Sequence, residues 1–286
     1  MSALTLRRDL AQIRRHVGTG QDNEAKDYGD DAIGFVTDRL DWNPDTWQRK
    51  LLSSKSDRLL LNCSRQSGKS TTAALLALHQ AVHHPGLILL VSPTLRQSRE
   101  LFAKVSGFLR QMKPRPRLTE DNKLSFTLAN GARVVCLPGS ADTIRGFSAP
   151  TLVIEDEAAF VEDALYIAVR PMLAVSGGRL ILMSTPFGKR EHFYEAWTGQ
   201  EDWQKIRITA DQCPRIKEEF LERELLALGE WWFKQEYLCE FVETADQVFR
   251  QQDIDAAFDA DIEPLLPDME SDNDNSVPML LRGYLS

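Results

Sequence analysis

From residue 59 onward, short apolar runs alternate with longer segments that have the apolar spacing of helices. The apolar runs predict strands at 59–63, 87–92, 151–155, 179–184 and about 205–208. The segments between them predict helices at 68–83, 95–112, 162–174 and 189–197, with further helices within 214–237. Strands that alternate with helices run parallel and are joined by right-handed crossovers. The pattern therefore predicts an α/β fold whose mostly parallel sheet is flanked by helices.

A hairpin interrupts this alternation. Two strand-like runs, 123–128 and 133–137, are separated by four residues that contain Asn130 and Gly131. An Asn-Gly pair between two such runs is typical of a hairpin turn. We therefore expect one antiparallel pair within the sheet.

The two ends of the chain differ from its middle. Residues 1–57 predict a small helical lead-in, with helices near 4–17 and 32–40 and a helical segment at 47–53, packed on a main domain at 58–245. Residues 251–281 hold nine acidic residues and no lysine or arginine. Such a segment buries little apolar surface, so 246–286 is expected to be a flexible acidic linker or tail.

Composition limits the kinds of partner. With 286 residues, 43% of them hydrophobic, the chain can bury one large core or two modest ones. A net charge of −8 opposes general attraction to nucleic acid, so any DNA contact must be local, and 104–117 holds five basic residues and no acid. Without a membrane-length apolar run or a signal peptide, a cytoplasmic protein is expected. The cysteines lack the spacing of a metal or disulfide site and are expected to be buried free thiols: Cys63, Cys136, Cys213 and Cys239.

The strand at 59–63 leads into a short polar loop and then into Gly68-Lys69-Ser70-Thr71, at the start of a helix. This order predicts a phosphate cradle. Backbone N–H groups of such a loop converge on a β-phosphate, Lys69 can reach the β- and γ-phosphates, and the Ser70 hydroxyl can complete a magnesium shell. The strict motif has glycine where this chain has Cys63, and an ordinary strand-turn-helix unit with a solvated lysine is the alternative.

A second signal lies at 151–157, where an apolar strand ends in Asp156 and Glu157. Side chains alternate along a strand, so both carboxylates reach one site only if the strand ends near Asp156. Asp156 then suits the magnesium shell, and Glu157 suits the orientation of a water molecule against the γ-phosphate. A strand that ends in surface acids is the alternative, but it does not explain why the phosphate loop is present as well.

A third signal follows the strand at 179–184, where Ser184 and Thr185 precede a turn that contains Pro186 and Gly188. Their hydroxyls would arrive at the same edge of the sheet as the γ-phosphate and could sense it. The turn could move when the phosphate leaves. A plain strand-to-helix turn built from turn-forming residues explains these positions equally well.

Taken together, these residues resemble the large subunit of the terminase that packages DNA into the heads of tailed bacteriophages. The resemblance covers about residues 40–250. It is carried by the segments 43–48, 64–71, 144–146, 154–158, 184–188 and 232–241, followed by Val248 and Phe249. It implies a P-loop NTPase fold of the RecA/ASCE type, with ATP and Mg²⁺ bound.

The resemblance also implies roles for individual residues. Gln48 would contact the edge of the adenine, and the remaining loop residues, Ser64, Gln66, Ser67 and Thr71, would complete the nucleotide site. Arg65 and Arg145 compete for the role of the arginine that neutralises charge in the transition state. We favour Arg145, acting across a ring interface. Ser184 and Thr185 would couple hydrolysis to movement.

The implied protein is a magnesium-dependent ATPase that drives double-stranded DNA into a procapsid in the host bacterial cytoplasm. Its partners would be the DNA, a portal protein and a small terminase subunit, and it would form a homo-oligomeric ring on the procapsid, with a monomer in isolation left open. No membrane contact is expected. The family's ribonuclease-H-type nuclease motifs are not visible, so we expect a motor without nuclease activity, whether a fragment, a split gene or a decayed prophage copy.

The sequence leaves two alternatives open. A superfamily-2-like DNA helicase or translocase would share the Asp156-Glu157 pair and the Ser-Thr motif, but it would need a second RecA-like domain. A prophage remnant that binds nucleotide without hydrolysing it would not be expected to retain Glu157.

Overall fold

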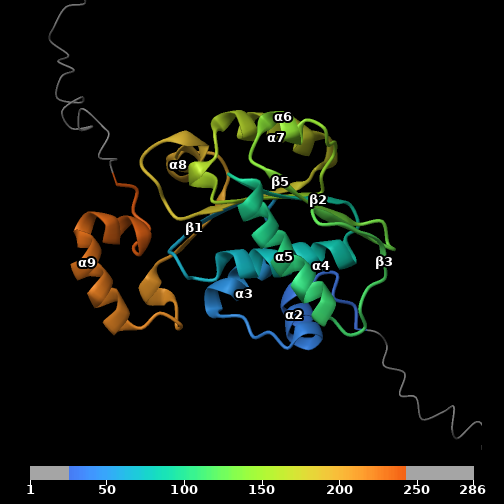
Figure 1. The fold of residues 1–286 in the computed structure, drawn as a ribbon, viewed down its shortest axis with the longest axis horizontal. Helices are drawn as coiled ribbons and strands as arrows, with labels where there is room; N and C mark the ends of the chain where they lie inside the picture. Colours follow the sequence, from blue (N-terminus) through green and yellow to red (C-terminus); the bar gives the residue numbers. More distant parts are fainter. Residues whose placement is uncertain (1–25, 243–286) are drawn as a thin grey trace, which may run out of the picture. The chain divides into compact units, whose positions relative to one another are not determined.

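An eight-stranded sheet separates two layers of helices in the computed structural model, which describes residues 26–242 (Figure 1). The order of strands is β3-β4-β5-β2-β6-β7-β1-β8. All pairs from β5 to β8 are parallel, whereas β4 is antiparallel to both β5 and β3. The strands are β1 Arg58–Cys63, β2 Leu87–Ser92, β3 Leu118–Asp121, β4 Ser125–Leu128, β5 Arg133–Pro138, β6 Leu152–Asp156, β7 Arg179–Ser184 and β8 Gln204–Ile208. The predicted α/β fold and the predicted hairpin are both confirmed.

The helices divide between the two faces of the sheet (Figure 1). On one face lie α2 Ala32–Leu40, α3 Thr46–Leu52, α4 Lys69–His83 and α5 Leu95–Gln111. On the other lie α6 Ala141–Ile144, α7 Asp163–Ser176 and α8 Glu191–Thr198. Helix α9 Glu218–Glu236 follows β8 and extends away from the sheet. The described residues also form two short 3-10 helices, η1 Ala158–Phe160 and η2 Ala210–Gln212.

The structure adds three features that the pattern did not predict. The edge strand β3 is formed by Leu-Thr-Glu-Asp, whose last three side chains are exposed, so no apolar alternation announced it. The short helix α6 follows β5. Helix α9 is broken at Gly229, whose φ of 78° and ψ of 166° are not helical. The predicted helix at 4–17 and the predicted tail at 246–286 lie outside the described residues.

The sheet has a hydrophobic core on each face, and alternate residues of one strand enter different cores. In β1, Leu59 and Leu61 pack with α2 to α5, whereas Leu60 packs with α7 and α8. In β6, Ile154 packs in the core that contains α2 to α5, and Val153 packs in the core that contains α7 and α8. A strand covered on both sides has no polar face, which is why its sequence is a continuous apolar run.

The four cysteines are free and buried, as predicted. Burial raises the pKa of the Cys63 thiol to about 12 and that of Cys136 to about 11. Both thiols therefore stay protonated at neutral pH and act as small apolar side chains. Among the described residues, no helix is long and apolar enough to cross a membrane.

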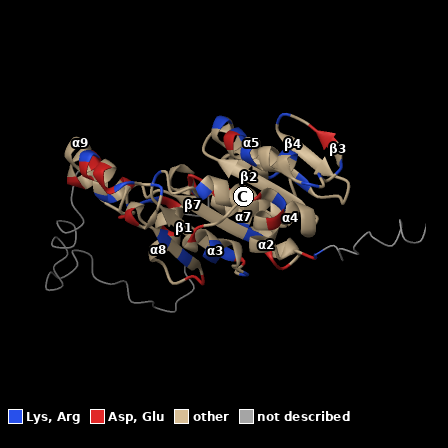
Figure 2. Cartoon of the chain, turned by 90° about the horizontal axis from the view of Figure 1, so that it is seen from below, with Lys and Arg blue, Asp and Glu red and all other residues tan. Residues whose placement is uncertain are grey.

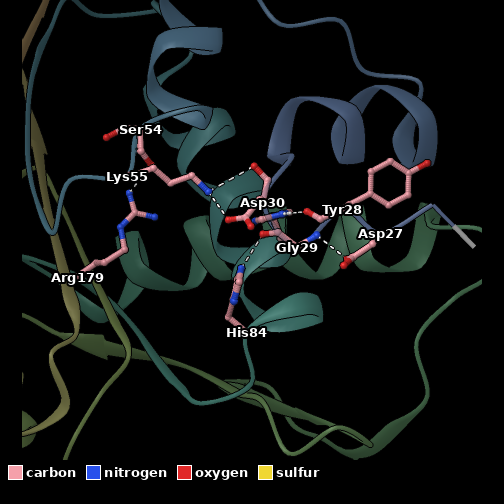
Figure 3. A network of polar contacts seen from close by, with 9 residues as sticks. Asp27, Tyr28, Gly29, Asp30, Ser54, Lys55, His84 and Arg179 are labelled. Atoms are coloured by element: carbon pink, nitrogen blue, oxygen red, sulfur yellow. Dashed lines mark hydrogen bonds and ion pairs between the residues drawn. The ribbon is translucent and has the colours of Figure 1, made fainter.

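The segments next to α2 and α3 contact residues near the amino ends of β1 and β7, and Figure 3 shows the polar network that they form. Lys55 forms an ion pair with Asp30, and His84 Nε2 lies 2.7 Å from the Gly29 carbonyl oxygen. Arg179, the first residue of β7, donates to the Ser54 carbonyl oxygen at 3.2 Å. A cavity of about 370 Å³ lies among these residues. This end of the sheet is opposite the carboxyl ends of the strands, where α/β proteins bind ligands.

Substitution at Gly178 tests the close approach between β7 and the segment before β6. A Cβ at Gly178 would lie 2.2 Å from the Pro150 carbonyl oxygen, so Gly178→Ala is expected to destabilise the fold by about 1–3 kcal/mol. A Cβ at Gly107, within α5, meets nothing within 4 Å, so Gly107→Ala is expected to stabilise it by about 0.5–1 kcal/mol. Urea unfolding of both variants measures the two effects, and equal shifts would contradict the close-packing interpretation.

Candidate active site

Three of the predicted site segments meet at one edge of the sheet. In the sheet, β7 lies between β1 and β6, and all three strands are parallel. Their carboxyl ends therefore lie at the same edge, where β1 leads into the loop at 64–68, β6 ends at Asp156 and β7 ends at Ser184. This geometry brings together residues that are more than 100 positions apart in the chain.

The phosphate loop joins β1 to α4. Gly68 caps the amino end of α4 with a φ of 95°, and Gln66 is also left-handed, with a φ of 59°. Cys63, which replaces the first glycine of the strict motif, is the last residue of β1 and pairs with Ile208 in β8. Because its backbone is that of an ordinary strand residue, this position does not require glycine. The departure from the motif therefore leaves the loop geometry unaffected.

The two carboxylates reach the loop by different contacts. Asp156 ends β6, and its Oδ2 accepts a hydrogen bond of 3.0 Å from the Ser70 hydroxyl. Glu157 turns into the left-handed region, with a φ of 57°, and its Oε1 lies 2.9 Å from Lys69 Nζ. A left-handed conformation costs a residue with a Cβ roughly 1–2 kcal/mol. This turn is what directs two consecutive side chains into one site, as the sequence required.

For both Lys69 and Asp156, burial and the opposite charge nearby shift the pKa in opposite directions. Burial disfavours the charged form of Lys69, but Glu157 and Asp156 outweigh it and raise the lysine pKa. Burial raises the pKa of Asp156, and the charge of Lys69 opposes that shift. The two acids therefore keep the buried Lys69 side chain in its charged form.

The donor set fits Mg²⁺ bound with a triphosphate. Ser70 and Asp156 provide a hydroxyl and a carboxylate oxygen, and Mg²⁺ is typically held by one or two carboxylates together with phosphate oxygens and water. Within the loop, Ser67 is fully buried and its hydroxyl makes no hydrogen bond. An unpaired buried hydroxyl is costly, and a phosphate oxygen would satisfy it.

The predicted coupling residues lie beside Glu157. Ser184 and Thr185 are buried. The Ser184 hydroxyl donates to the Thr185 carbonyl oxygen at 2.7 Å and lies 3.5 Å from Glu157 Oε2. The turn that follows contains Gly188, with a φ of 69°, and leads into α8.

The two candidate arginines have different surroundings. Arg65 forms an ion pair with Glu236 at the end of α9, and its backbone N–H donates to the Glu236 carbonyl oxygen at 3.1 Å. Arg145 follows α6, and its side chain is 65% exposed and pairs with Asp142 at 3.4 Å. The structure does not bring Arg145 into contact with Lys69 or Glu157.

Gln48 lies beside the loop, but its amide is partly engaged. The side chain is buried, and its Oε1 accepts the Asp45 N–H at 2.8 Å. Its Nε2 would be 3.2 Å from a Cβ at Gly68. In this arrangement, the amide nitrogen faces the phosphate loop while the amide oxygen caps α3.

Sequence reasoning missed a buried polar cluster under β6. Glu155 is fully buried on the opposite face of the strand from Asp156, and its Oε1 lies 2.8 Å from His192 Nε2. Asp163 Oδ1 lies 3.2 Å from His192 Nδ1, and Tyr166 stacks on the imidazole with ring centroids 4.8 Å apart. Burial lowers the pKa of His192, but Glu155 and Asp163 reverse that effect and raise it. A glutamate inside an apolar strand was the only sequence signal of this cluster.

Known proteins resemble the chain in sequence and in fold. A family model described as terminase large subunit, T4-like-virus type, N-terminal, matches residues 60–256. The large terminase subunit of Thermus phage G20c is 27% identical over 253 residues, which cover 75% of this chain and 52% of that protein. The chain therefore spans about half the length of the curated relatives it matches.

Two solved structures share the fold. The large terminase ATPase domain of Thermus phage P74-26 matches with a TM-score of 0.60 and 24% identity, over 72% of this chain and 97% of that one. The large terminase of a bacteriophage described as thermophilic, in complex with ATP-γ-S, matches with a TM-score of 0.51 and 17% identity, over 69% of this chain and 51% of that one. At these identities, the likeness shows the fold alone.

Removal of His192 tests the buried cluster. His192→Leu is expected to destabilise the fold by about 3–5 kcal/mol, because it leaves the buried Glu155 carboxylate without its partner. The double variant Glu155→Leu/His192→Leu removes both charges and is expected to recover most of that loss. Chemical unfolding of the wild type, the single variant and the double variant measures the difference. A double variant that is no more stable than His192→Leu would contradict this pairing.

Proposed function

The chain belongs to the terminase large subunit family of the T4-like-virus type, and we propose that it is a magnesium-dependent ATPase that couples ATP hydrolysis to translocation of double-stranded DNA into a viral procapsid. The contacts of Lys69 with Glu157 and of Ser70 with Asp156 carry this proposal, because they join a phosphate loop to two carboxylates at one edge of a parallel sheet. ATP-γ-S, the nucleotide named for the second of the two solved terminases, belongs to the ligand class that we propose for this loop.

In the proposed mechanism, Lys69 exchanges one anionic partner for another. Its Nζ pairs with Glu157 in this structure and would move to the β- and γ-phosphates of ATP. Glu157 is then released to orient a water molecule in line with the γ-phosphate, and its left-handed backbone keeps the side chain directed at that position. Ser70 and Asp156 would hold Mg²⁺, which neutralises charge on the phosphate oxygens when bound.

Ser184 supports a role for the following turn in coupling. Its hydroxyl is within 3.5 Å of Glu157, so a change in the partner of Glu157 alters the environment of Ser184 directly. Thr185 and the turn that contains Gly188 connect this point to α8. We propose that loss of the γ-phosphate is relayed along this segment.

A basic groove supports local contact with DNA phosphates. Between α5 and the β3–β4 hairpin lies a groove of about 530 Å³ lined by Arg96, Arg99, Arg110 and Lys123, together with Glu100 and Asp121. Figure 2 shows basic residues on α5 and acidic residues on β3. Among the described residues, these four cations form no ion pair. Unpaired cations can replace counterions on a DNA backbone even when the protein is acidic overall. The basic run predicted at 104–117 contributes Arg110 to this groove.

The assembly that we propose follows from the family. It is a homo-oligomeric ring on the procapsid, in the host cytoplasm, with a portal protein and a small terminase subunit as partners. In that ring, the exposed Arg145 would reach the nucleotide of a neighbouring subunit, whereas Arg65 would act within its own subunit.

Two substitutions separate binding from hydrolysis. Lys69→Ala is expected to weaken ATP binding by about 2 kcal/mol or more, roughly 30-fold, because the phosphates lose a buried cation. Glu157→Gln is expected to bind ATP but to hydrolyse it ~10²–10⁴-fold more slowly. Calorimetry and steady-state phosphate release measure these effects, with Lys205→Ala as a surface control. Unimpaired hydrolysis by Glu157→Gln would refute its assignment as the base.

Mixing of variants tests the donor of the arginine. Arg145→Ala is expected to lose ~10³–10⁵-fold in turnover on portal-bearing procapsids with DNA. Addition of Lys69→Ala subunits should restore part of that turnover, because they supply Arg145 to intact nucleotide sites next to them. The control is Arg223→Ala, a change of an exposed arginine on α9, which should hydrolyse ATP normally. If Arg65→Ala is rescued by mixing and Arg145→Ala is not, the assignment is reversed.

A further inference from the structure

Arg215 contacts the phosphate loop from a distant part of the chain. It lies between η2 and α9, and its Nη2 donates to the Ser67 carbonyl oxygen at 2.7 Å. Its Nη1 forms an ion pair with Asp45, the residue that precedes α3. A Cβ at Gly68 would lie 3.2 Å from Arg215 Nη2, so the guanidinium is packed directly against the loop.

The contact with Ser67 determines the direction of an N–H group. The Ser67 carbonyl and the Gly68 N–H belong to one planar trans peptide and point to opposite sides of it. By binding the Ser67 carbonyl oxygen, Arg215 holds this peptide so that the Gly68 N–H points away from the guanidinium. Inward N–H groups are what bind phosphate in a loop of this kind. Arg215 therefore orients a phosphate-binding group without touching phosphate itself.

The contact with Asp45 links Arg215 to Gln48, on the adenine side of the proposed nucleotide site. Asp45 is the N-cap of α3, and its N–H donates to Gln48 Oε1 at 2.8 Å. Gln48 is the residue that family resemblance assigns to the adenine. A continuous chain of polar contacts thus runs from Gln48 through Asp45 and Arg215 to Ser67.

We propose that Arg215 is a positioning residue that couples base recognition to phosphate binding, so that a bound adenine helps to order the phosphate loop. The proposal rests on the proposed nucleotide function. It requires two simultaneous contacts from one side chain, which the forked guanidinium makes and a single ammonium does not. The base should therefore strengthen triphosphate binding in the wild type, and this benefit should shrink when the arginine is changed.

The test compares a triphosphate analogue that carries adenosine with a triphosphate that carries no nucleoside. Affinities for AMP-PNP and for inorganic tripolyphosphate, each with Mg²⁺, are measured by calorimetry for the wild type, Arg215→Gln and Arg215→Lys. The ratio of the two affinities reports the benefit of the base. It is expected to fall about 5–20-fold in Arg215→Gln and by a similar factor in Arg215→Lys, within the usual range of coupling between sites. The control Arg223→Gln should keep the wild-type ratio.

Asp45→Asn interrupts the same series of polar contacts, but at the partner of Arg215 and not at Arg215 itself. Asparagine is a good N-cap, so α3 should persist while the ion pair with Arg215 is lost. The affinity ratio should fall as in Arg215→Gln, and this variant decides the question if Arg215→Gln does not fold. A parallel loss of both affinities, or no change in either, would overturn the coupling. A wild type that binds neither probe would instead refute the proposed function.

Discussion

The fold is organised around the charge of Lys69. A buried ammonium is tolerated only when it is paired, and its partners here are delivered by another strand. Glu157 reaches it only because β6 ends one residue earlier and the backbone then turns left-handed. The parallel sheet is what makes this pairing possible, because it puts the ends of β1, β6 and β7 at the same edge. The ion pair is therefore both a stabilising contact and the resting state of the proposed catalytic site.

The phosphate loop is supported by the end of β8 and by the segment that follows it. The Ser64 N–H donates to the Ile208 carbonyl oxygen at 2.8 Å, Arg65 pairs with Glu236, and the Ser67 carbonyl oxygen accepts from Arg215. A loop rich in exposed N–H groups has little internal hydrogen bonding, so contacts of this kind determine its shape. These contacts fix the conformation of the loop that we propose to bind the phosphates.

Strand β6 connects the two faces of the sheet at the site. Asp156 faces the phosphate loop, and Glu155, its neighbour, faces α8 and pairs with His192. The segment from Ser184 to His192 therefore begins beside Glu157 and ends on Glu155. Glu157 contacts the start of this segment at Ser184, and Glu155 contacts its end at His192. Both ends of the proposed coupling segment are therefore attached to residues next to Asp156.

The local pattern of residues was sufficient to predict most of the elements and the residues at the centre of the candidate site. Continuous apolar runs indicated strands covered on both faces, and the Gly68-Lys69-Ser70 and Asp156-Glu157 motifs each depend on neighbours in the chain. Only the tertiary structure showed that Cys63 has the backbone conformation of an ordinary strand residue, because this depends on its pairing with Ile208 in β8. It also decided the contacts of Arg215 and of His192, whose partners lie 148 and 37 positions away. No local pattern encodes which distant side chain will meet a buried carbonyl or carboxylate, since only the packing of the whole sheet and its helices brings them together.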